Sequence, residues 1–244
     1  MHRLLCRSIS LLAYIPREMR RHMTKPLQIS FSTRAFLANL STATAVANTR
    51  YLQSMHRGTL SPLDYGCLTV QDAYYCYHAK DTLKVLLDRI DGRTESELYE
   101  LVESKLRAYD DYNRTFIEDW HIRDAESVLP TETMRLYAAH ERRVACEEEP
   151  IYGLVAYLPC YQLWPWFARQ LMRSPLYRPG VYKDWFECIY QGERESFGGS
   201  WLMGNFIEDW RDRGKPFDED LAHDIYRTSM DFELKVFTEA CPDA

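Results

Sequence analysis

The sequence predicts an all-α protein, a compact bundle of seven or eight helices in one domain. Glycine is scarce, with 10 residues in 244, and runs that alternate polar and apolar residues are few. Most apolar residues recur at the three- and four-residue spacing of amphipathic helices. A chain of this length can also bury a full core in a single domain.

Turn and cap signals divide the chain into elements. A first helix is expected over about 33–48. Ser61-Pro62-Leu63-Asp64 is typical of a helix start, because serine caps the first turn, proline suits the first position and an acid complements the helix dipole. That helix runs to about residue 87. Proline and glycine signals then separate helices near 94–120, 131–147, 150–173, 180–195, 200–212 and 217–239.

The segment 151–168 carries no charge in eighteen residues and is expected to be a buried core helix. It is too short and too interrupted by glycine and proline to cross a bilayer, so no membrane partner is expected. At helical spacing Cys160 lies on an apolar, aromatic stripe, and Pro159 before it favours a bend that places the thiol at a cavity. A free cysteine is most often a small buried hydrophobe, so Cys160 becomes a functional candidate only through other residues.

Charge divides the chain at about residue 26. Residues 1–25 hold six basic residues and one acid, whereas 26–244 hold 24 basic and 35 acidic residues. The first segment has the composition of a mitochondrial transit peptide, and an ordinary extension ahead of an internal start near Met23 is an equal alternative. We expect a single helical domain over 26–244, cytoplasmic, or mitochondrial if 1–25 is a transit peptide. Its acidic balance argues against nucleic acid as a partner.

Cysteine and histidine patterns provide no metal or disulfide framework. The seven cysteines are scattered and form no C-x-x-C, which indicates a reducing compartment. The histidines form no H-E-x-x-H, and no glycine-rich phosphate loop is present. We therefore expect neither a metal nor a cofactor.

Carboxylates and tyrosines occupy positions where the helical pattern requires apolar residues. Asp72 and Tyr75 lie one turn apart on the apolar face of the helix after Ser61, and Glu233 lies at the centre of such a face in the last helix. Tyr137 is the polar member of a third stripe. Buried carboxylates need donors or a ligand, and burial raises the pKa of a glutamate toward neutrality, where it can donate a proton. Each could be a structural residue alone; together with Cys160 they provide the groups for nucleophilic attack with acid–base help.

These residues belong to motifs that resemble a known family. Gly58-Thr59-Leu60, Gln71-Asp72-Ala73-Tyr74-Tyr75, Leu158-Pro159-Cys160 and Ser229 with Glu233 follow the order and nearly the spacings of the TenA (thiaminase II) family, from about residue 54 to the C-terminus. The resemblance implies a haem-oxygenase-like helical bundle that forms a homotetramer. It also implies cofactor-free hydrolysis of a C–N bond of a thiamin-type aminopyrimidine, in thiamin salvage or degradation.

The resemblance also implies a role for each residue. Cys160 matches the nucleophile, and Glu233 matches the acid that protonates the ring nitrogen. Asp72 matches the residue that binds the substrate and assists the nucleophile. Tyr75 matches a tyrosine that packs on the pyrimidine and orients the glutamate, and Tyr137 matches a second tyrosine of the site.

Two positions depart from the family pattern. Trp164 replaces a pocket tyrosine and removes a hydroxyl, and Ile189 stands where a further tyrosine is expected, with Tyr190 one residue later. A shift of one residue turns a helical side chain by about 100°. Trp164 and Tyr190 are retained as predicted substrate-binding residues. These departures favour, as an alternative, a non-catalytic small-molecule-binding protein on the same scaffold; a metal-dependent oxygenase would need a Glu/His/Asp ligand set that the histidines do not provide.

Overall fold

The computed structural model describes residues 18–190 and 198–241, which form α-helices and short 3-10 helices without a strand. The α-helices are α1 (Phe31–Ala38), α2 (Leu40–Ala47), α3 (Arg50–His56), α4 (Pro62–Arg89), α5 (Ser96–Trp120), α6 (Glu132–Glu147), α7 (Pro150–Met172), α8 (Lys183–Tyr190), α10 (Gly198–Asp212) and α11 (Glu219–Glu239). The 3-10 helices are η3 (Glu18–Met23), η4 (Ala125–Ser127) and η5 (Gly180–Tyr182). The predicted all-α class is confirmed.

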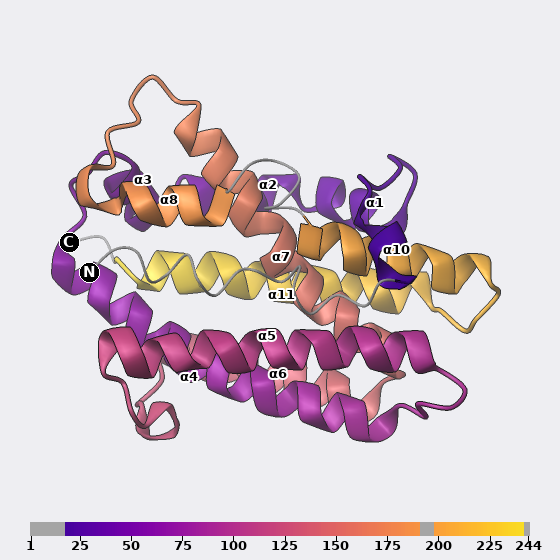
Figure 1. The fold of residues 1–244 in the computed structure, drawn as a ribbon. Coiled ribbons are helices and arrows are strands. Elements are labelled where there is room, and N and C mark those ends of the chain that lie inside the picture. The colour runs from indigo at the N-terminus through magenta and orange to yellow at the C-terminus, as the bar shows by residue number, and fades with distance from the viewer. Residues whose placement is uncertain (1–17, 191–197, 242–244) are drawn as a thin grey trace.

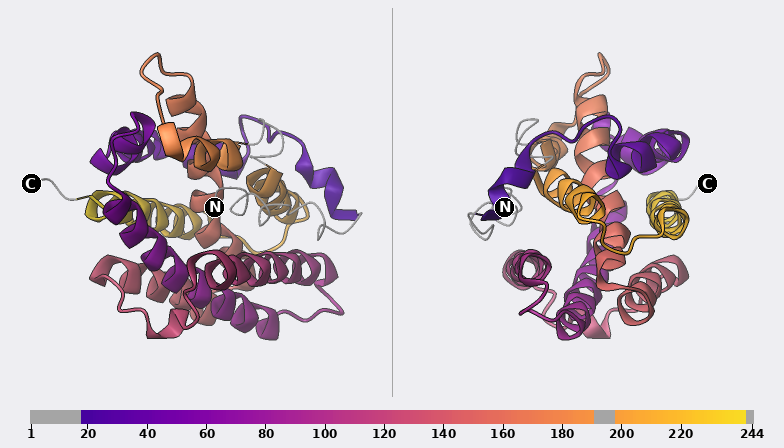
Figure 2. Two further views of the ribbon diagram at one scale, coloured as in Figure 1. Left: turned by 60° about the vertical axis from the view of Figure 1, so that its left-hand side comes forward. Right: turned by 90° about the vertical axis from the view of Figure 1, so that its right-hand side faces the viewer.

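Helix α7 runs through the middle of the bundle (Figures 1 and 2). Helices α4, α5 and α6 lie together on one side, and α1, α2, α3, α8 and α10 lie on the other, with α11 between them. Fifteen residues of α7 are buried, including Pro159 and Pro165, and the helix continues through both prolines. Gly153 lets α7 approach α4 closely, because a Cβ there would lie 2.5 Å from Leu86 Cδ2.

Local cap chemistry explains where two helices begin. The Ser61 hydroxyl accepts a hydrogen bond from the backbone N–H of Asp64, and Pro62 is the first residue of α4, as predicted. Thr131 caps α6 in the same way through the backbone N–H of Met134.

The helix predicted over 33–48 is instead two helices. The prediction of one continuous helix was wrong, because the helix is interrupted at Asn39. The Asn39 side chain donates to the Ala35 carbonyl at 2.9 Å, and the Asn39 backbone has φ −106° and ψ 18°. An asparagine that bonds its own backbone in this way competes with the helical ladder. The short helix α3, which follows, was not predicted.

The boundary predicted at residue 26 also differs from the structure. Met19 and His22 of η3 are buried against α10, and Asn205 Nδ2 donates to the carbonyls of His22 and Thr24 at 2.6 and 2.7 Å. Apolar burial and hydrogen bonds thus join residues 18–25 to the domain. The transit peptide predicted within 1–25 falls mainly on 1–17, outside the described residues.

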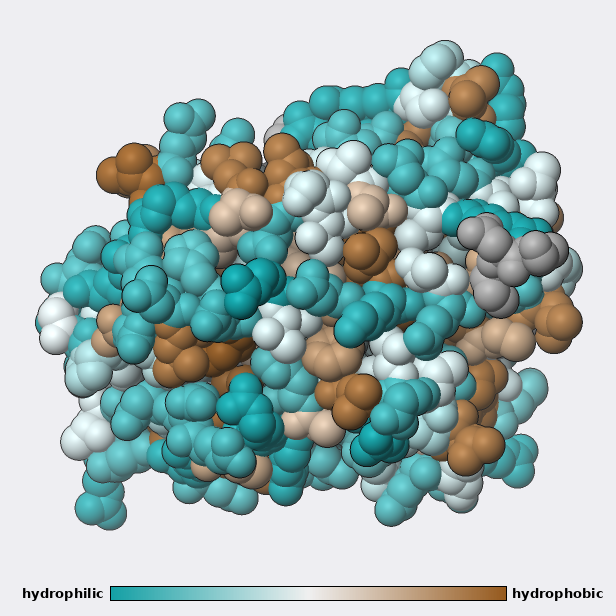
Figure 3. Space-filling model, turned by 180° about the vertical axis from the view of Figure 1, so that it is seen from behind, coloured by the Kyte–Doolittle hydropathy of each residue, from teal (hydrophilic) through white to brown (hydrophobic). Residues whose placement is uncertain are grey.

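Figure 3 shows that the rear face of the molecule is mainly hydrophilic, with hydrophobic residues in separate small groups. Within the described residues, no helix combines the length and apolar character needed to cross a membrane.

Candidate active site

Five of the predicted functional side chains come from α7 and from three helices that contact it. Asp72 and Tyr75 lie on α4, Tyr137 on α6, Cys160 on α7 and Glu233 on α11. Each occupies a buried or half-buried face of an amphipathic helix, which explains why residues far apart in sequence meet. Tyr75 and Tyr137 face one another, with ring centroids 5.0 Å apart.

Glu233 is held by donors from two neighbouring helices. The Tyr137 hydroxyl donates to its Oε1 at 3.0 Å, and the Trp164 indole N–H donates to its Oε2 at 3.2 Å. Glu233 is only 4% exposed. Burial raises the pKa of the carboxyl to about 7, although the two donors and the Cys160 thiol favour its charged form. Glu233 can therefore exchange a proton near neutral pH.

Asp72 accepts hydrogen bonds from side chains of α5 and α4. The Tyr112 hydroxyl donates to its Oδ2 at 3.1 Å, and the Cys76 thiol donates to its Oδ1 at 3.7 Å. Burial raises the pKa of Asp72 to about 6, and the hydrogen bonds from Tyr112 and Cys76 limit the rise. Its carboxylate is ionised at a pH where Glu233 still holds a proton.

Cys160 is half-buried, and its thiol forms a hydrogen bond with Glu233 and interacts electrostatically with Asp72. Burial raises the pKa of the thiol well above its ordinary value, and the nearby charges of Glu233, Asp72 and Glu141 raise it further. A thiol in this environment is protonated at neutral pH, so nucleophilic attack requires a base. Of Asp72 and Glu233, Asp72 has the lower pKa.

The hydrogen bond of Tyr75 differs from the predicted one, in which Tyr75 orients Glu233. The Tyr75 hydroxyl donates to Oε1 of Glu141 at 2.6 Å, whereas Tyr137 and Trp164 are the residues that hold Glu233. The prediction that Tyr75 orients Glu233 is therefore replaced by orientation through Tyr137 and Trp164. The substitution of tryptophan at 164 removes a hydroxyl but provides an indole N–H in its place.

Tyr190 is the last residue of α8 and is half-buried. Within the part of the chain that the structure describes, no hydrogen bond joins it to Cys160, Asp72 or Glu233. Its role in substrate binding stays a prediction.

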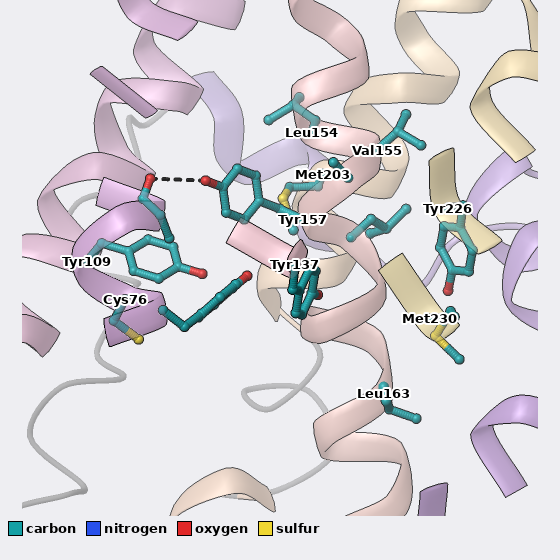
Figure 4. Close-up of a cluster of buried hydrophobic side chains, with 14 of the residues drawn as sticks. Cys76, Tyr109, Tyr137, Leu154, Val155, Tyr157, Leu163, Met203, Tyr226 and Met230 are labelled. Carbon is teal, nitrogen blue, oxygen red and sulfur yellow. Dashed lines mark hydrogen bonds between the residues drawn. The ribbon is translucent and has the colours of Figure 1, made fainter. Parts of the chain in front are cut away.

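Several residues near the site had no predicted role. Glu141 is 1% exposed, and burial raises the pKa of its carboxyl well above the ordinary value. Tyr109 and Tyr157 pack against each other between α5 and α7, with Cys76 nearby (Figure 4). The sequence signal for Tyr109 and Tyr112 is their spacing on the buried face of α5, and for Glu141 its place four residues after Tyr137.

Among the residues described, no three His, Cys, Asp or Glu side chains gather in a way that could hold a metal ion. The described site offers two proton-exchanging carboxyls, a thiol and several tyrosine hydroxyls. This set can activate a thiol and protonate a heterocyclic nitrogen.

The fold resembles solved structures from archaea and a cyanobacterium. A TenA homologue from P. horikoshii OT3 aligns with a TM-score of 0.70 and 18% identity, over 87% of this chain and 98% of that protein. The chain has the TenA fold. A candidate TenA-like thiaminase from Sulfolobus solfataricus P2 aligns with a TM-score of 0.63 and 16% identity, over 85% and 93% of the two chains. Heme oxygenase-1 from Synechocystis sp. PCC6803 aligns at 0.53 with 14% identity, over 86% and 92%, which confirms the predicted haem-oxygenase-like bundle.

Neither a protein-family model nor a curated protein sequence matches the chain. At 14–18% identity, the solved structures establish the fold of this chain.

Proposed function

We propose that the protein is a cofactor-free cysteine hydrolase that cleaves a C–N bond of a thiamin-type aminopyrimidine. The observation that carries the proposal is the pairing of Cys160 with Glu233, a buried carboxyl whose pKa of about 7 lets it donate a proton at neutral pH. The TenA fold and the motif resemblance support the substrate class.

The proposed reaction begins with proton transfer from the Cys160 thiol to Asp72. The sulfur then adds to the ring carbon beside the substituted position, while Glu233 protonates the ring nitrogen that receives the electron pair. A neutral aminopyrimidine is a poor electrophile until that nitrogen is protonated, so a carboxyl with a raised pKa suits this step.

The adduct then releases the substituent. Electrons from the protonated ring expel the leaving amine from the exocyclic carbon, and Asp72 returns its proton to that amine. Water adds to the resulting methylene group and gives a proton to Asp72. The sulfur then departs as a thiolate and takes that proton, while the ring nitrogen returns its proton to Glu233 and the aromatic ring is restored. The net reaction replaces the amine with a hydroxyl, and both carboxyls return to their starting protonation states.

The test is to incubate the purified full chain with thiamin and with 4-amino-5-aminomethyl-2-methylpyrimidine and to analyse the products by mass spectrometry. A hydroxymethylpyrimidine from either compound is the expected result. A folded protein that is stabilised against heat by either compound without forming product would instead support the non-catalytic alternative, which the tryptophan at 164 and the isoleucine at 189 favour.

Trp164 provides a second prediction. Replacement by phenylalanine removes the N–H that favours the charged form of Glu233. We expect the pKa of Glu233 to rise, so that the alkaline limb of the kcat/KM profile moves upward in pH while the maximal rate falls by roughly tenfold or less. Trp166→Phe on the same helix is the matched control, and an unshifted alkaline limb in Trp164→Phe would contradict the assigned contact.

A further inference from the structure

Helix α5 carries one charged residue on its buried face. Lys105 is 2% exposed and lies in a stripe of otherwise neutral buried residues that includes Val102, Ala108 and Tyr109. The other lysines near this region behave differently: Lys80 and Lys84 are more exposed and each pairs with an aspartate. A buried ammonium is costly unless an anion or hydrogen-bond acceptors compensate it.

Lys105 lacks such compensation in the described structure. Its Nζ lies 4.3 Å from the centre of the Tyr161 ring. Among the residues described, it forms no ion pair and donates no hydrogen bond, and burial alone lowers its pKa to about 7. The contact with one ring face is a weaker partner than a carboxylate for a group removed from water.

The position of Lys105 relates it to the candidate active site. Tyr161, which it contacts, follows Cys160 in α7 and interacts with Tyr109, one turn from Lys105 on α5. Two turns from Lys105 on the same helix, Tyr112 donates to Asp72. Tyr112, which contacts Asp72, and Lys105 therefore lie on α5 about 10 Å apart along the helix axis.

We propose that Lys105 binds an oxyanion, a phosphate or carboxylate, carried by a substituent of the substrate. This inference rests on the proposed function for the pyrimidine itself. With the ring held between Asp72 and Glu233, a short substituent directed along α5 would bring its oxyanion to the ammonium. The anion provides the missing charge, and the Tyr161 hydroxyl, which accepts a hydrogen bond from Tyr109, is a nearby donor.

The same geometry disfavours a cationic leaving group. The thiazolium of thiamin would meet a like charge at Lys105, whereas a neutral or anionic substituent would not. Among thiamin-type aminopyrimidines, one whose substituent ends in an oxyanion should therefore bind more tightly than one whose substituent is a cation.

The experiment measures binding to the full chain by calorimetry. The probes are 4-amino-5-hydroxymethyl-2-methylpyrimidine, its phosphate ester and the 5-carboxymethyl analogue, which separate phosphate from carboxylate recognition. We expect wild type to bind at least one anionic probe about tenfold or more tightly than the alcohol, and Lys105→Met to lose that preference. Lys84→Met, an exposed lysine on α4, is expected to keep it.

Inorganic sulfate separates a failure of this inference from a failure of the proposed function. Sulfate at low millimolar concentration should raise the Tm of wild type more than that of Lys105→Met, whether or not pyrimidines bind. In wild type it should also compete with the preferred anionic probe and not with the alcohol, a comparison that needs no variant. Equal binding of all three pyrimidines, or sulfate effects that Lys105→Met retains, would overturn the oxyanion site and leave the hydrolase proposal intact.

Discussion

Replacing Cys160 by alanine is expected to lower turnover of the pyrimidine substrate by roughly 1,000-fold or more while the protein remains folded and still binds the ligand. The sulfur forms the covalent bond in the proposed reaction, so its removal eliminates the reaction path and not only a contact. Cys160 is half-buried, and the loss of one atom is a small change in packing. The measurement is single-turnover kinetics, with ligand binding followed by calorimetry.

The matched control is Cys146→Ser, because Cys146 is an exposed cysteine on α6. It should retain wild-type kinetics. A second thiol makes the test sharper: Cys76 also lies beside Asp72, but it is 3% exposed and donates to that carboxyl. Acid quench and peptide mass mapping should locate the pyrimidine adduct on Cys160. An adduct on Cys76, or substantial turnover by Cys160→Ala, would refute the assignment of the nucleophile.

The pH dependence of kcat/KM follows from the two carboxyls. Asp72 must be ionised to accept the thiol proton, and Glu233 must be protonated to donate to the ring. The rate should therefore rise as pH increases through about 6 and fall as pH increases through about 7, which gives a narrow bell.

Local signals explain how much of the fold could be predicted from the sequence. The Ser61 cap, the proline after it and the apolar stripes with Asp72 and Glu233 are short-range patterns, and the structure places each as expected. The break at Asn39 depends on one side-chain hydrogen bond that competes with helix continuation, and composition does not reveal which asparagine will form it.

The partners of the site residues depend on how helices cross, and this information is not local. Tyr112 reaches Asp72 from α5, and Tyr75 reaches Glu141 on α6 instead of Glu233. The indole of Trp164 donates to Glu233 because α7 and α11 pack together, so a residue identified as a departure from the family pattern becomes a donor. Lys105 lies on a buried stripe that periodicity could have identified, but only the three-dimensional structure shows that its contact is the ring of Tyr161 and that no described carboxylate pairs with it.

Replacing Glu233 by glutamine is expected to slow the reaction by about 10²–10⁴-fold, because it removes the proton donor. The same change should stabilise the protein at alkaline pH. The folded-state pKa of Glu233 is about 7, above the ordinary value of 4.5, so the folded state holds a proton that the unfolded state has lost between these pH values. Its contribution to the free energy of unfolding is fully present below about pH 4.5 and is lost as pH rises through 7.

The full difference in pKa corresponds to a loss of about 3 kcal/mol in the free energy of unfolding of wild type at alkaline pH. In Glu233→Gln one hydrogen-bond donor faces the new amide group, so we expect the variant to be more stable than wild type by about 2 kcal/mol. Urea unfolding at pH 5 and pH 8 measures it. Wild type should lose more stability between these pH values than Glu233→Gln, which should be the more stable protein at pH 8. Asp231→Asn, an exposed change on the same helix, should follow wild type.

Equal pH dependence in wild type and Glu233→Gln would show that the carboxyl is not desolvated in the folded protein. Lower activity together with higher stability of Glu233→Gln at pH 8 would show that the Glu233 carboxyl is desolvated in the folded protein and is needed for the reaction. A protein that only needed to fill its core could place a neutral residue between Tyr137 and Trp164, because a buried carboxyl destabilises the fold wherever it ionises. Retention of the acid at a cost in stability is what a proton donor beside Cys160 requires.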